Sequence, residues 1–169
     1  MNKLKYVVID VDGTMTDGGI YYDNSGNELK KFNTRDAAGF FAFREAGIKV
    51  VVVTGRESQA VLTRMTEMKV DYLFQNVKNK DAFLERFISD NGIEREELAY
   101  IGDDMNDYFP AKKWAGYIAC PADACKEMLD LADYVSKASG GYGVVRDVAE
   151  HILSEDNHWF EIMKKIYED

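Results

Sequence analysis

Four runs of apolar residues recur along the chain, and each is ended by glycine or polar residues. They occupy positions 6–9, 49–53, 72–74 and 98–101. A strand that is buried on both faces of a parallel sheet has this continuous apolar character. Stretches with helical periodicity lie at 37–46, 58–68, 81–91 and 144–153. Because strand and helix alternate, the pattern predicts an α/β fold with a doubly wound, Rossmann-like parallel sheet.

One segment departs from this alternation and predicts a β-hairpin. Positions 19–22 and 28–32 have strand character and flank the stretch 23–27, which is dense in turn-forming residues. We expect the hairpin at about 18–33, inserted after the first strand. The remainder of the segment before the second strand has room for only one helix. The sequence therefore predicts no cap domain.

The C-terminal positions form a separate unit in the pattern. Residues 154–169 carry large apolar side chains at helical spacing, namely Trp159, Phe160, Ile162, Met163 and Ile166. This spacing predicts an amphipathic helix. A chain of 169 residues with 46% hydrophobic content suits a single core. We therefore expect one α/β domain at 1–153 and a helical tail at 154–169.

The net charge argues against one large class of partner. A formal charge of −9 and a pI near 4.8 repel polyanions, so we expect no nucleic acid partner. The first apolar run is too short for a signal peptide or a membrane span, so we expect no membrane association. The two cysteines, Cys120 and Cys125, lack the further partners of a zinc site and are expected to be reduced thiols. These features together predict a cytoplasmic protein.

Polar residues follow the predicted strands at the ends where ligands bind in open α/β sheets. In chain order they are Asp10, Asp12, Thr54, Lys80, Asp103 and Asp104. Several carboxylates directed into one crevice make a site for a hard cation that prefers oxygen ligands. Mg²⁺ fits best, because it takes one or two carboxylates and leaves its other positions to water and substrate phosphate.

Each of these features has an ordinary explanation when taken alone. The spacing of Asp10, Asp12 and Gly13 also opens a calcium-binding loop, but such a loop lies between two helices, whereas an apolar strand precedes this one. Thr54 suits a helix cap and Lys80 suits a solvated helix position. Their joint occurrence at successive strand ends favours a catalytic site.

The same residues resemble the four motifs of the haloacid dehalogenase superfamily. The motifs are Asp-Val-Asp-Gly-Thr at 10–14, Thr-Gly-Arg at 54–56, Lys80, and Gly-Asp-Asp at 102–104 with Asp107. The chain is more closely similar to a capless branch, the 3-deoxy-manno-octulosonate 8-phosphate phosphatases, from about residue 6 to residue 153. The further matches lie at 16–18, 35–36, 64, 100–101, 123–124 and 140–146.

The resemblance implies a two-step phosphoryl transfer that depends on Mg²⁺. Asp10 is then the nucleophile, which forms an aspartyl-phosphate, and a metal ligand. Asp12 is the general acid and base, and its backbone carbonyl also binds the metal. Neighbouring carboxylates with opposite roles need different environments to separate their pKa values.

The remaining motif residues bind the phosphoryl group and the metal in this interpretation. Asp103 is the other carboxylate on Mg²⁺, with Asp104 and Asp107 in support. Thr54 and the N–H of Gly55 bind the transferring phosphoryl oxygens. Lys80 neutralises charge between the phosphate and the nucleophile.

The resemblance also implies a substrate and an assembly. The expected substrate is a keto-deoxy sugar acid phosphate of lipopolysaccharide biosynthesis. Its carboxylate would pair with arginines, whose guanidinium forks match a carboxylate bidentately, and the candidates are Arg35, Arg56, Arg64 and Arg146. An open site needs a cover that excludes water. The branch implies a homo-oligomer, a tetramer, in which a neighbour's hairpin supplies it.

Three other functions remain open from the sequence. A phosphatase for a nine-carbon keto-sugar acid 9-phosphate uses the same scaffold, although Arg56 with Arg64 favours the eight-carbon substrate. A receiver module also gathers acidic residues, Thr and Lys around Mg²⁺, but its phosphoacceptor would follow the third strand, where Gln75 and Asn76 stand instead. An inactive oligomeric scaffold would not need both Asp10 and Asp12.

Overall fold

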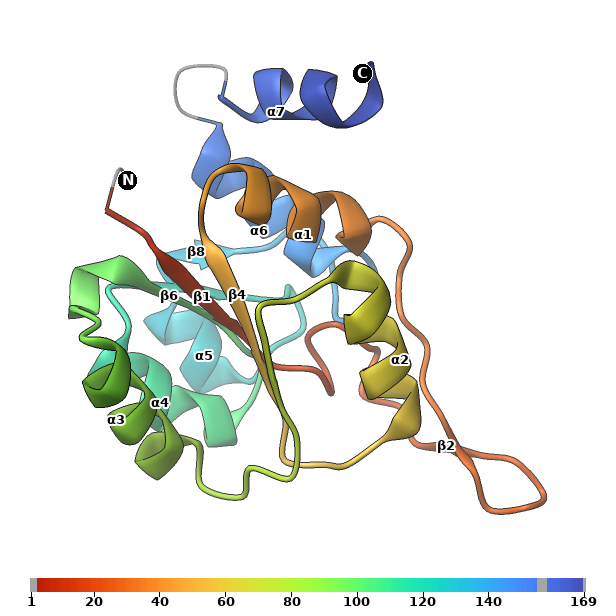
Figure 1. Ribbon diagram of the computed structural model, residues 1–169. Coiled ribbons are helices and arrows are strands. Elements are labelled where there is room, and N and C mark those ends of the chain that lie inside the picture. Colours follow the sequence, from red (N-terminus) through yellow and green to blue (C-terminus); the bar gives the residue numbers. More distant parts are fainter. Residues whose placement is uncertain (1–2, 155–157, 169) are drawn as a thin grey trace.

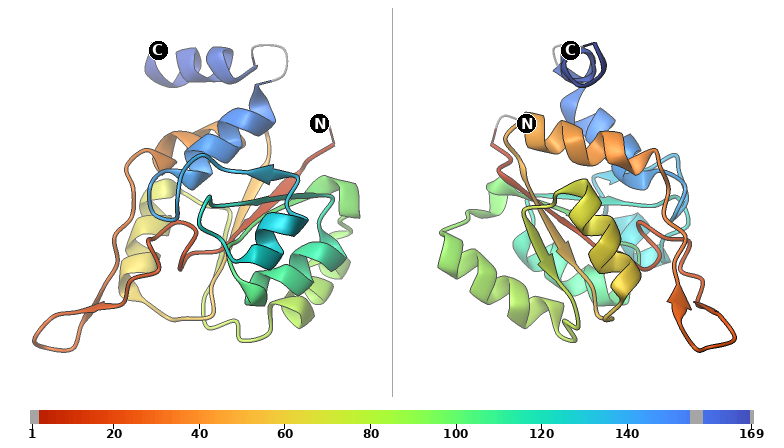
Figure 2. Two further views of the ribbon diagram at one scale, coloured as in Figure 1. Left: turned by 180° about the vertical axis from the view of Figure 1, so that it is seen from behind. Right: turned by 45° about the vertical axis from the view of Figure 1, so that its right-hand side comes forward.

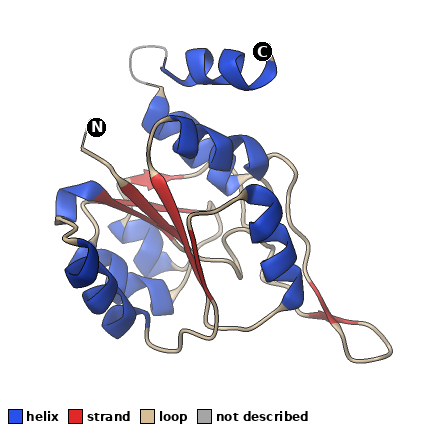
Figure 3. Ribbon diagram, in the orientation of Figure 1, coloured by secondary structure: helices blue, strands red, loops and turns tan. Residues whose placement is uncertain are grey.

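Six parallel strands form the central sheet of the computed structural model, which describes residues 3–154 and 158–168 (Figures 1 and 3). In chain order the strands are β1 (Tyr6–Ile9), β4 (Lys49–Val53), β5 (Tyr72–Phe74), β6 (Leu98–Ile101), β7 (Tyr117–Cys120) and β8 (Tyr134–Val135). Their spatial order is β5-β4-β1-β6-β7-β8, and every neighbouring pair is parallel. The chain therefore builds the sheet outward from β1, first to one side and then to the other.

Helices cover both faces of this sheet (Figure 2). They are α1 (Asp36–Glu45), α2 (Gln59–Met68), α3 (Lys80–Asn91), α4 (Met105–Trp114), α5 (Lys126–Leu131), α6 (Val144–Leu153) and α7 (His158–Tyr167), with a 3-10 turn η1 (Arg95–Glu97). Successive strand residues face opposite layers: Val7 packs into the cluster of α1, α2 and α6, and Val8 into the cluster of α3, α4 and α5. This arrangement confirms the predicted doubly wound sheet.

A β-hairpin leaves the body between β1 and α1. Its strands β2 (Tyr21–Tyr22) and β3 (Glu28–Leu29) are antiparallel, and a bridge between Thr16 and Phe32 closes its base. At its tip Oδ1 of Asp23 accepts the N–H groups of Ser25 and Asn27, both at 2.8 Å. The hairpin extends away from the domain in all the views of Figures 1 and 2. Between β1 and β4 the described chain contains only this hairpin and α1 as larger elements, and no cap.

The last helix, α7, lies across α1 (Figure 1). Its Ile162 is buried, and Trp159, Met163 and Ile166 pack against the same cluster as α1 and α6. Four of the five apolar positions predicted for this helix thus contact the domain, whereas Phe160 is exposed. Residues 155–157 and 169 of the predicted tail lie outside the described residues. Over the described ranges, no helix is long and apolar enough to cross a membrane.

Candidate active site

Asp10 stands at the carboxyl end of the central strand β1. Its N–H donates to the carbonyl of Ile101 at 2.9 Å, which continues the pairing of β1 with β6 by one residue. The chain adds β4 and β5 on one side of β1 and then β6, β7 and β8 on the other, so the strand order reverses between β1 and β6, and crevices form there in open α/β folds. The side chain of Asp10 is only 4% exposed. A carboxylate in this position is held rigidly and is shielded from water.

Lys80 supplies the positive charge beside Asp10. It begins α3, whose N-terminus is capped by the side chain of Asn79. Its Nζ lies 2.5 Å from Oδ1 of Asp10 and 2.6 Å from Oδ1 of Asp107. Burial lowers the pKa of Lys80, but the two carboxylates outweigh burial and raise the pKa to about 12. Lys80 is therefore a permanent cation between Asp10 and Asp107.

Three buried or half-buried carboxylates form the acidic cluster Asp10, Asp103 and Asp107, whose oxygens lie within 4.8 Å of one another. Asp107 is already occupied, since it also accepts from the hydroxyl of Tyr100 at 2.6 Å and from the N–H of Asp103 at 3.2 Å. Asp103 accepts only from Thr14, at 3.0 Å, among the side-chain contacts that the described residues make. Asp10 and Asp103 therefore fit as the carboxylate ligands of a hard divalent cation, and Asp107 orients the groups around them.

The pKa values of the acidic cluster also indicate that the site needs a bound cation. Burial, and after it the charge of Asp107, raises the pKa of Asp10 well above its ordinary value. The same two causes raise the pKa of Asp103 to about 6. A bound cation favours the ionised carboxylate and so offsets both effects. The donor set thus suits a divalent cation such as Mg²⁺, which would keep Asp10 ionised.

Asp12 faces a different set of partners from Asp10. Its Oδ2 accepts from Oγ1 of Thr54 at 3.3 Å, and its Oδ1 accepts from Nζ of Lys30. Thr54 ends β4, and its Oγ1 also accepts the N–H of Arg56 at 3.2 Å. Gly55 follows directly, with its carbonyl 2.5 Å from Nζ of Lys78. The two aspartates of the first motif are therefore held by different lysines.

The structure brings the predicted catalytic residues together, with one addition and one change of place. Asp104 caps α4 by accepting the N–H of Met105 at 2.8 Å and is exposed, so it supports the site through the helix. Lys30 was not predicted. The sequence indicated only that it belongs to the second strand of the hairpin, although alternation along that strand places Glu28, Lys30 and Phe32 on one face. This shared face is the sequence feature that could have indicated a contact of Lys30 with the site.

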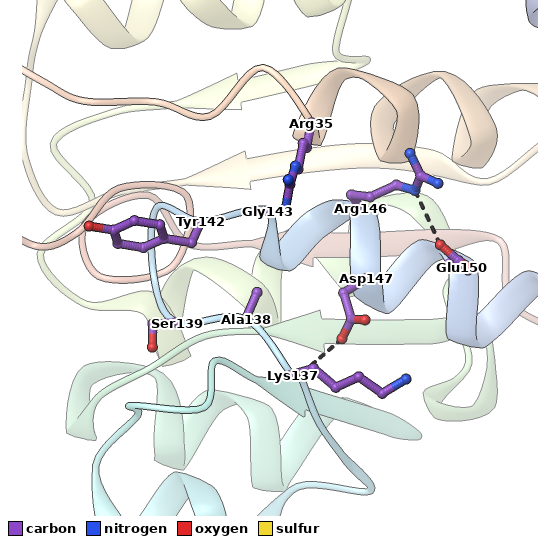
Figure 4. A pocket seen from close by; sticks show the side chains of 9 residues that line it. All are labelled: Arg35, Lys137, Ala138, Ser139, Tyr142, Gly143, Arg146, Asp147 and Glu150. Carbon is purple, nitrogen blue, oxygen red and sulfur yellow. Dashed lines mark hydrogen bonds and ion pairs between the residues drawn. The ribbon is translucent and has the colours of Figure 1, made fainter.

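The four candidate arginines do not form a single clamp. Arg35 and Arg146 line a cavity of about 660 Å³ between the start of α1, the start of α6 and the loop 137–143 (Figure 4). There, Nε of Arg146 pairs with Glu150 at 3.2 Å. Arg56 instead pairs with Glu28 of hairpin strand β3, at 2.5 Å. Arg64 pairs with Glu67 at 3.1 Å and donates to the carbonyl of Asn33 at 3.4 Å.

Fold and site together define a class of protein. The sheet is doubly wound and has no cap among the described residues. An Asp-x-Asp pair follows β1, Thr54 follows β4, Lys80 begins α3 and Asp103 follows β6. This is the arrangement of a haloacid dehalogenase superfamily phosphohydrolase.

Comparisons with known proteins identify the family more closely. The 3-deoxy-D-manno-octulosonate 8-phosphate phosphatase KdsC of Escherichia coli K12 is 35% identical over 151 residues, which are 89% of this chain and 80% of the relative. The chain therefore belongs to the KdsC-like phosphatases of the haloacid dehalogenase superfamily. No family model matches the chain.

Solved structures agree with this assignment. The structure of 3-deoxy-D-manno-octulosonate 8-phosphate phosphatase from Moraxella catarrhalis, in complex with magnesium, phosphate and KDO, has a TM-score of 0.90 at 33% identity, covering 97% of this chain and 94% of that one. The phosphatase of the same name from Yersinia pestis has a TM-score of 0.87 at 34% identity, covering 94% of this chain and 85% of that one.

Proposed function

We propose that the protein is an Mg²⁺-dependent phosphatase that hydrolyses 3-deoxy-manno-octulosonate 8-phosphate. The observation that carries the proposal is that the two aspartates after β1 have different partners. Asp10 lies buried beside Lys80 and Asp103, whereas Asp12 lies beside Thr54 and outside the acidic cluster. One carboxylate is thus placed for metal binding and attack, and the other for proton transfer.

The first half of the reaction transfers the phosphoryl group to the protein. An oxygen of Asp10 attacks phosphorus as the bond from phosphorus to the sugar oxygen breaks, and Asp12 donates its proton to that leaving oxygen. Thr54 and the N–H of Gly55 hold the phosphoryl oxygens, and Lys80 compensates their charge. Asp10, Asp103 and the backbone carbonyl of Asp12 would hold Mg²⁺, which would supply further compensation of charge.

The second half restores the enzyme. Asp12, now ionised, takes a proton from water, and the resulting oxygen attacks phosphorus of the aspartyl-phosphate. The bond between phosphorus and Asp10 breaks and inorganic phosphate leaves. Asp12 ends protonated and is ready for another turnover, so no other proton donor is required.

The substrate assignment rests on the relatives and on the cations around the site. The Moraxella catarrhalis enzyme was solved with KDO, which carries a carboxylate. Arg56 lies at the rim beside Thr54, and Arg64 is half-buried on α2, so both are candidates for that carboxylate. Arg35 and Arg146 remain candidates at their separate cavity. We propose that an enzyme for a substrate of this kind acts in the cytoplasm, in lipopolysaccharide sugar biosynthesis.

The hairpin supports a homo-oligomeric assembly, which we propose is a tetramer. Ile20, Tyr21, Tyr22 and Leu29 are all exposed, and an isolated two-stranded ribbon is marginally stable in water unless it packs on something. The tip extends away from its own domain, where a second copy of the chain can receive it (Figure 1). We propose that each tip covers the open site of a neighbouring subunit.

A phosphate-release assay on a substrate panel tests the proposal. The panel contains 3-deoxy-manno-octulosonate 8-phosphate, a nine-carbon keto-sugar acid 9-phosphate and p-nitrophenyl phosphate, each with Mg²⁺ and with EDTA. We expect the highest kcat/KM for the eight-carbon substrate, and no activity in EDTA. Asp10→Asn is expected to abolish release, whereas Asp130→Asn, on the exposed face of α5, is the matched control and keeps it. An Asp10→Asn variant with a tenth of wild-type turnover would refute the covalent mechanism.

A further inference from the structure

Lys30 is a buried cation in the base of the hairpin. Its side chain is 2% exposed although it lies next to an exposed ribbon, and its Nζ contacts Oδ1 of Asp12. The same Nζ lies 3.5 Å from Oε1 of Glu28. A lysine is rarely buried unless it is paired, so this burial indicates a specific role for both contacts.

Glu28 fixes the position of Lys30. Its carboxylate is 14% exposed, and Oε1 also accepts from Nη2 of Arg56 at 2.5 Å. Arg56 follows the Thr-Gly pair at the end of β4, so the ion pairs join the hairpin to the rim of the catalytic site. The ammonium of Lys30 is therefore held from two sides, by Glu28 and by Asp12.

The two oxygens of Asp12 consequently have different surroundings. Oδ1 is held by Lys30, whereas Oδ2 faces Thr54, the residue at the phosphoryl position. An ammonium group can only donate hydrogen bonds. The hydroxyl of Thr54 can accept as well as donate, so a protonated Asp12 favours the proton on Oδ2, the oxygen beside Thr54.

We infer that Lys30 is a positioning residue, which orients the carboxyl group of Asp12 so that Oδ2 delivers and later accepts the proton. The inference rests on the proposed function, because it assumes that Asp12 serves as acid and base. Small errors in the placement of a catalytic group cost about a hundredfold in rate. Lys80 serves Asp10 in a parallel way, so each aspartate of the first motif has its own buried lysine.

The dependence on the leaving group distinguishes positioning from a merely structural role. A sugar alkoxide is a poor leaving group and needs the proton of Asp12, whereas the p-nitrophenolate anion leaves without one. Loss of Lys30 should therefore slow the first substrate far more than the second. General acid catalysis contributes about 10²–10⁴-fold, which sets the size of the expected change.

The test compares Lys30→Met with wild type on both substrates in the same preparation. The ratio of the two kcat values does not depend on the fraction of folded protein, so partial misfolding does not obscure it. We expect kcat for the sugar phosphate to fall about a hundredfold or more, and kcat for p-nitrophenyl phosphate to fall less than about tenfold. Lys30→Arg, which keeps a cationic donor, should restore part of the ratio.

Lys31→Met is the matched control, since Lys31 is half-exposed and lies over the ring of Tyr142, 3.9 Å from its centroid. Its substrate ratio should equal that of wild type. Equal losses on both substrates in Lys30→Met, an unchanged ratio, or loss of all activity on the aryl substrate would each overturn the inference. A wild-type protein with no phosphatase activity would instead refute the proposed function itself.

Discussion

A β-carbon at Gly13 would lie 2.1 Å from Oδ2 of Asp103. Gly13 follows the Asp-x-Asp pair, and its φ of +98° turns the chain back toward β6. The approach of backbone to carboxylate leaves no room for a side chain, and it brings the first and the last motif together. The acidic cluster depends on this contact as much as on the carboxylates themselves.

Gly13→Ala should therefore disable the site. The new methyl group must displace Asp103, which is a proposed metal ligand. We therefore expect phosphatase activity to fall at least about a hundredfold, and the Mg²⁺ concentration needed for half-maximal activity to rise. Gly26→Ala is the matched control, because Gly26 also has a positive φ, +83°, but no atom within 4 Å of the added carbon. Activity titrated against Mg²⁺ checks both variants, and equal behaviour would contradict the argument.

Asp36 predicts a dependence of stability on pH. Burial raises its pKa to about 6, despite the N–H groups of Val145 and Arg146 that it accepts at the start of α6. Because the folded pKa lies above the ordinary value, the folded state binds the proton more tightly. The contribution to stability is therefore greatest at low pH and is lost as the pH rises through about 6.

The variant Asp36→Asn removes this titration. Urea unfolding in EDTA should show wild type losing about 1 kcal/mol relative to Asp36→Asn between pH 5 and pH 7. The exposed Asp130→Asn should instead follow the wild-type curve over the same range. Parallel curves for wild type and Asp36→Asn would show that Asp36 titrates normally in the folded protein.

Arg64 predicts a difference between substrates. If its guanidinium binds the sugar carboxylate, Arg64→Ala should lower kcat/KM for 3-deoxy-manno-octulosonate 8-phosphate. The corresponding loss of transition-state stabilisation should be about 1–3 kcal/mol, the usual value of a hydrogen bond to a charged group. Turnover of p-nitrophenyl phosphate, which has no carboxylate, should change little. Arg44→Ala, whose guanidinium lies over Phe41 on α1, is the control. Equal losses on both substrates would assign Arg64 a structural role through Glu67 and Asn33.

The hairpin predicts complementation between subunits. One variant carries Asp10→Asn, with a dead site and an intact hairpin, and the other carries glycine at 20, 21 and 22, with a live site and no apolar tip. Co-refolding should give hybrids whose live sites are covered by intact neighbours, so that activity exceeds the sum of the separate variants. Adding Asp10→Asn to the glycine variant should remove the gain. Hybrids confirmed by mass spectrometry without recovered activity would refute coverage in trans.

Much of the sheet could be predicted from the sequence because its strands are buried on both faces. Such strands form unbroken apolar runs, and the four predicted runs became β1, β4, β5 and β6 with the same bounds. The hairpin was also predicted, because its turn residues are concentrated at 23–27. Its regular pairing is shorter than the strand character suggested, with only two residues in each strand.

Two of the elements that were not predicted have a weak sequence pattern for physical reasons. Strand β8 has two residues, and α4 contains Pro110, which breaks the usual helical pattern of hydrogen bonding. In the site, local sequence indicated which residues belong to motifs but not which partners hold them. The contact of Lys30 with Asp12 joins positions far apart in the chain, and only the folded hairpin base brings them together.

The central place of β1 has a consequence for how the protein is made. The strand that carries Asp10 leaves the ribosome before both of its neighbours, β4 and β6, and β6 ends only at Ile101. Its second edge therefore stays open while much of the chain is synthesised, and such non-local pairing is slow. The loop that packs on Gly13, through Gly140, arrives later still. We expect that an incomplete nascent chain has no hydrolytic activity, and that chaperones meet it with the edge of β1 exposed.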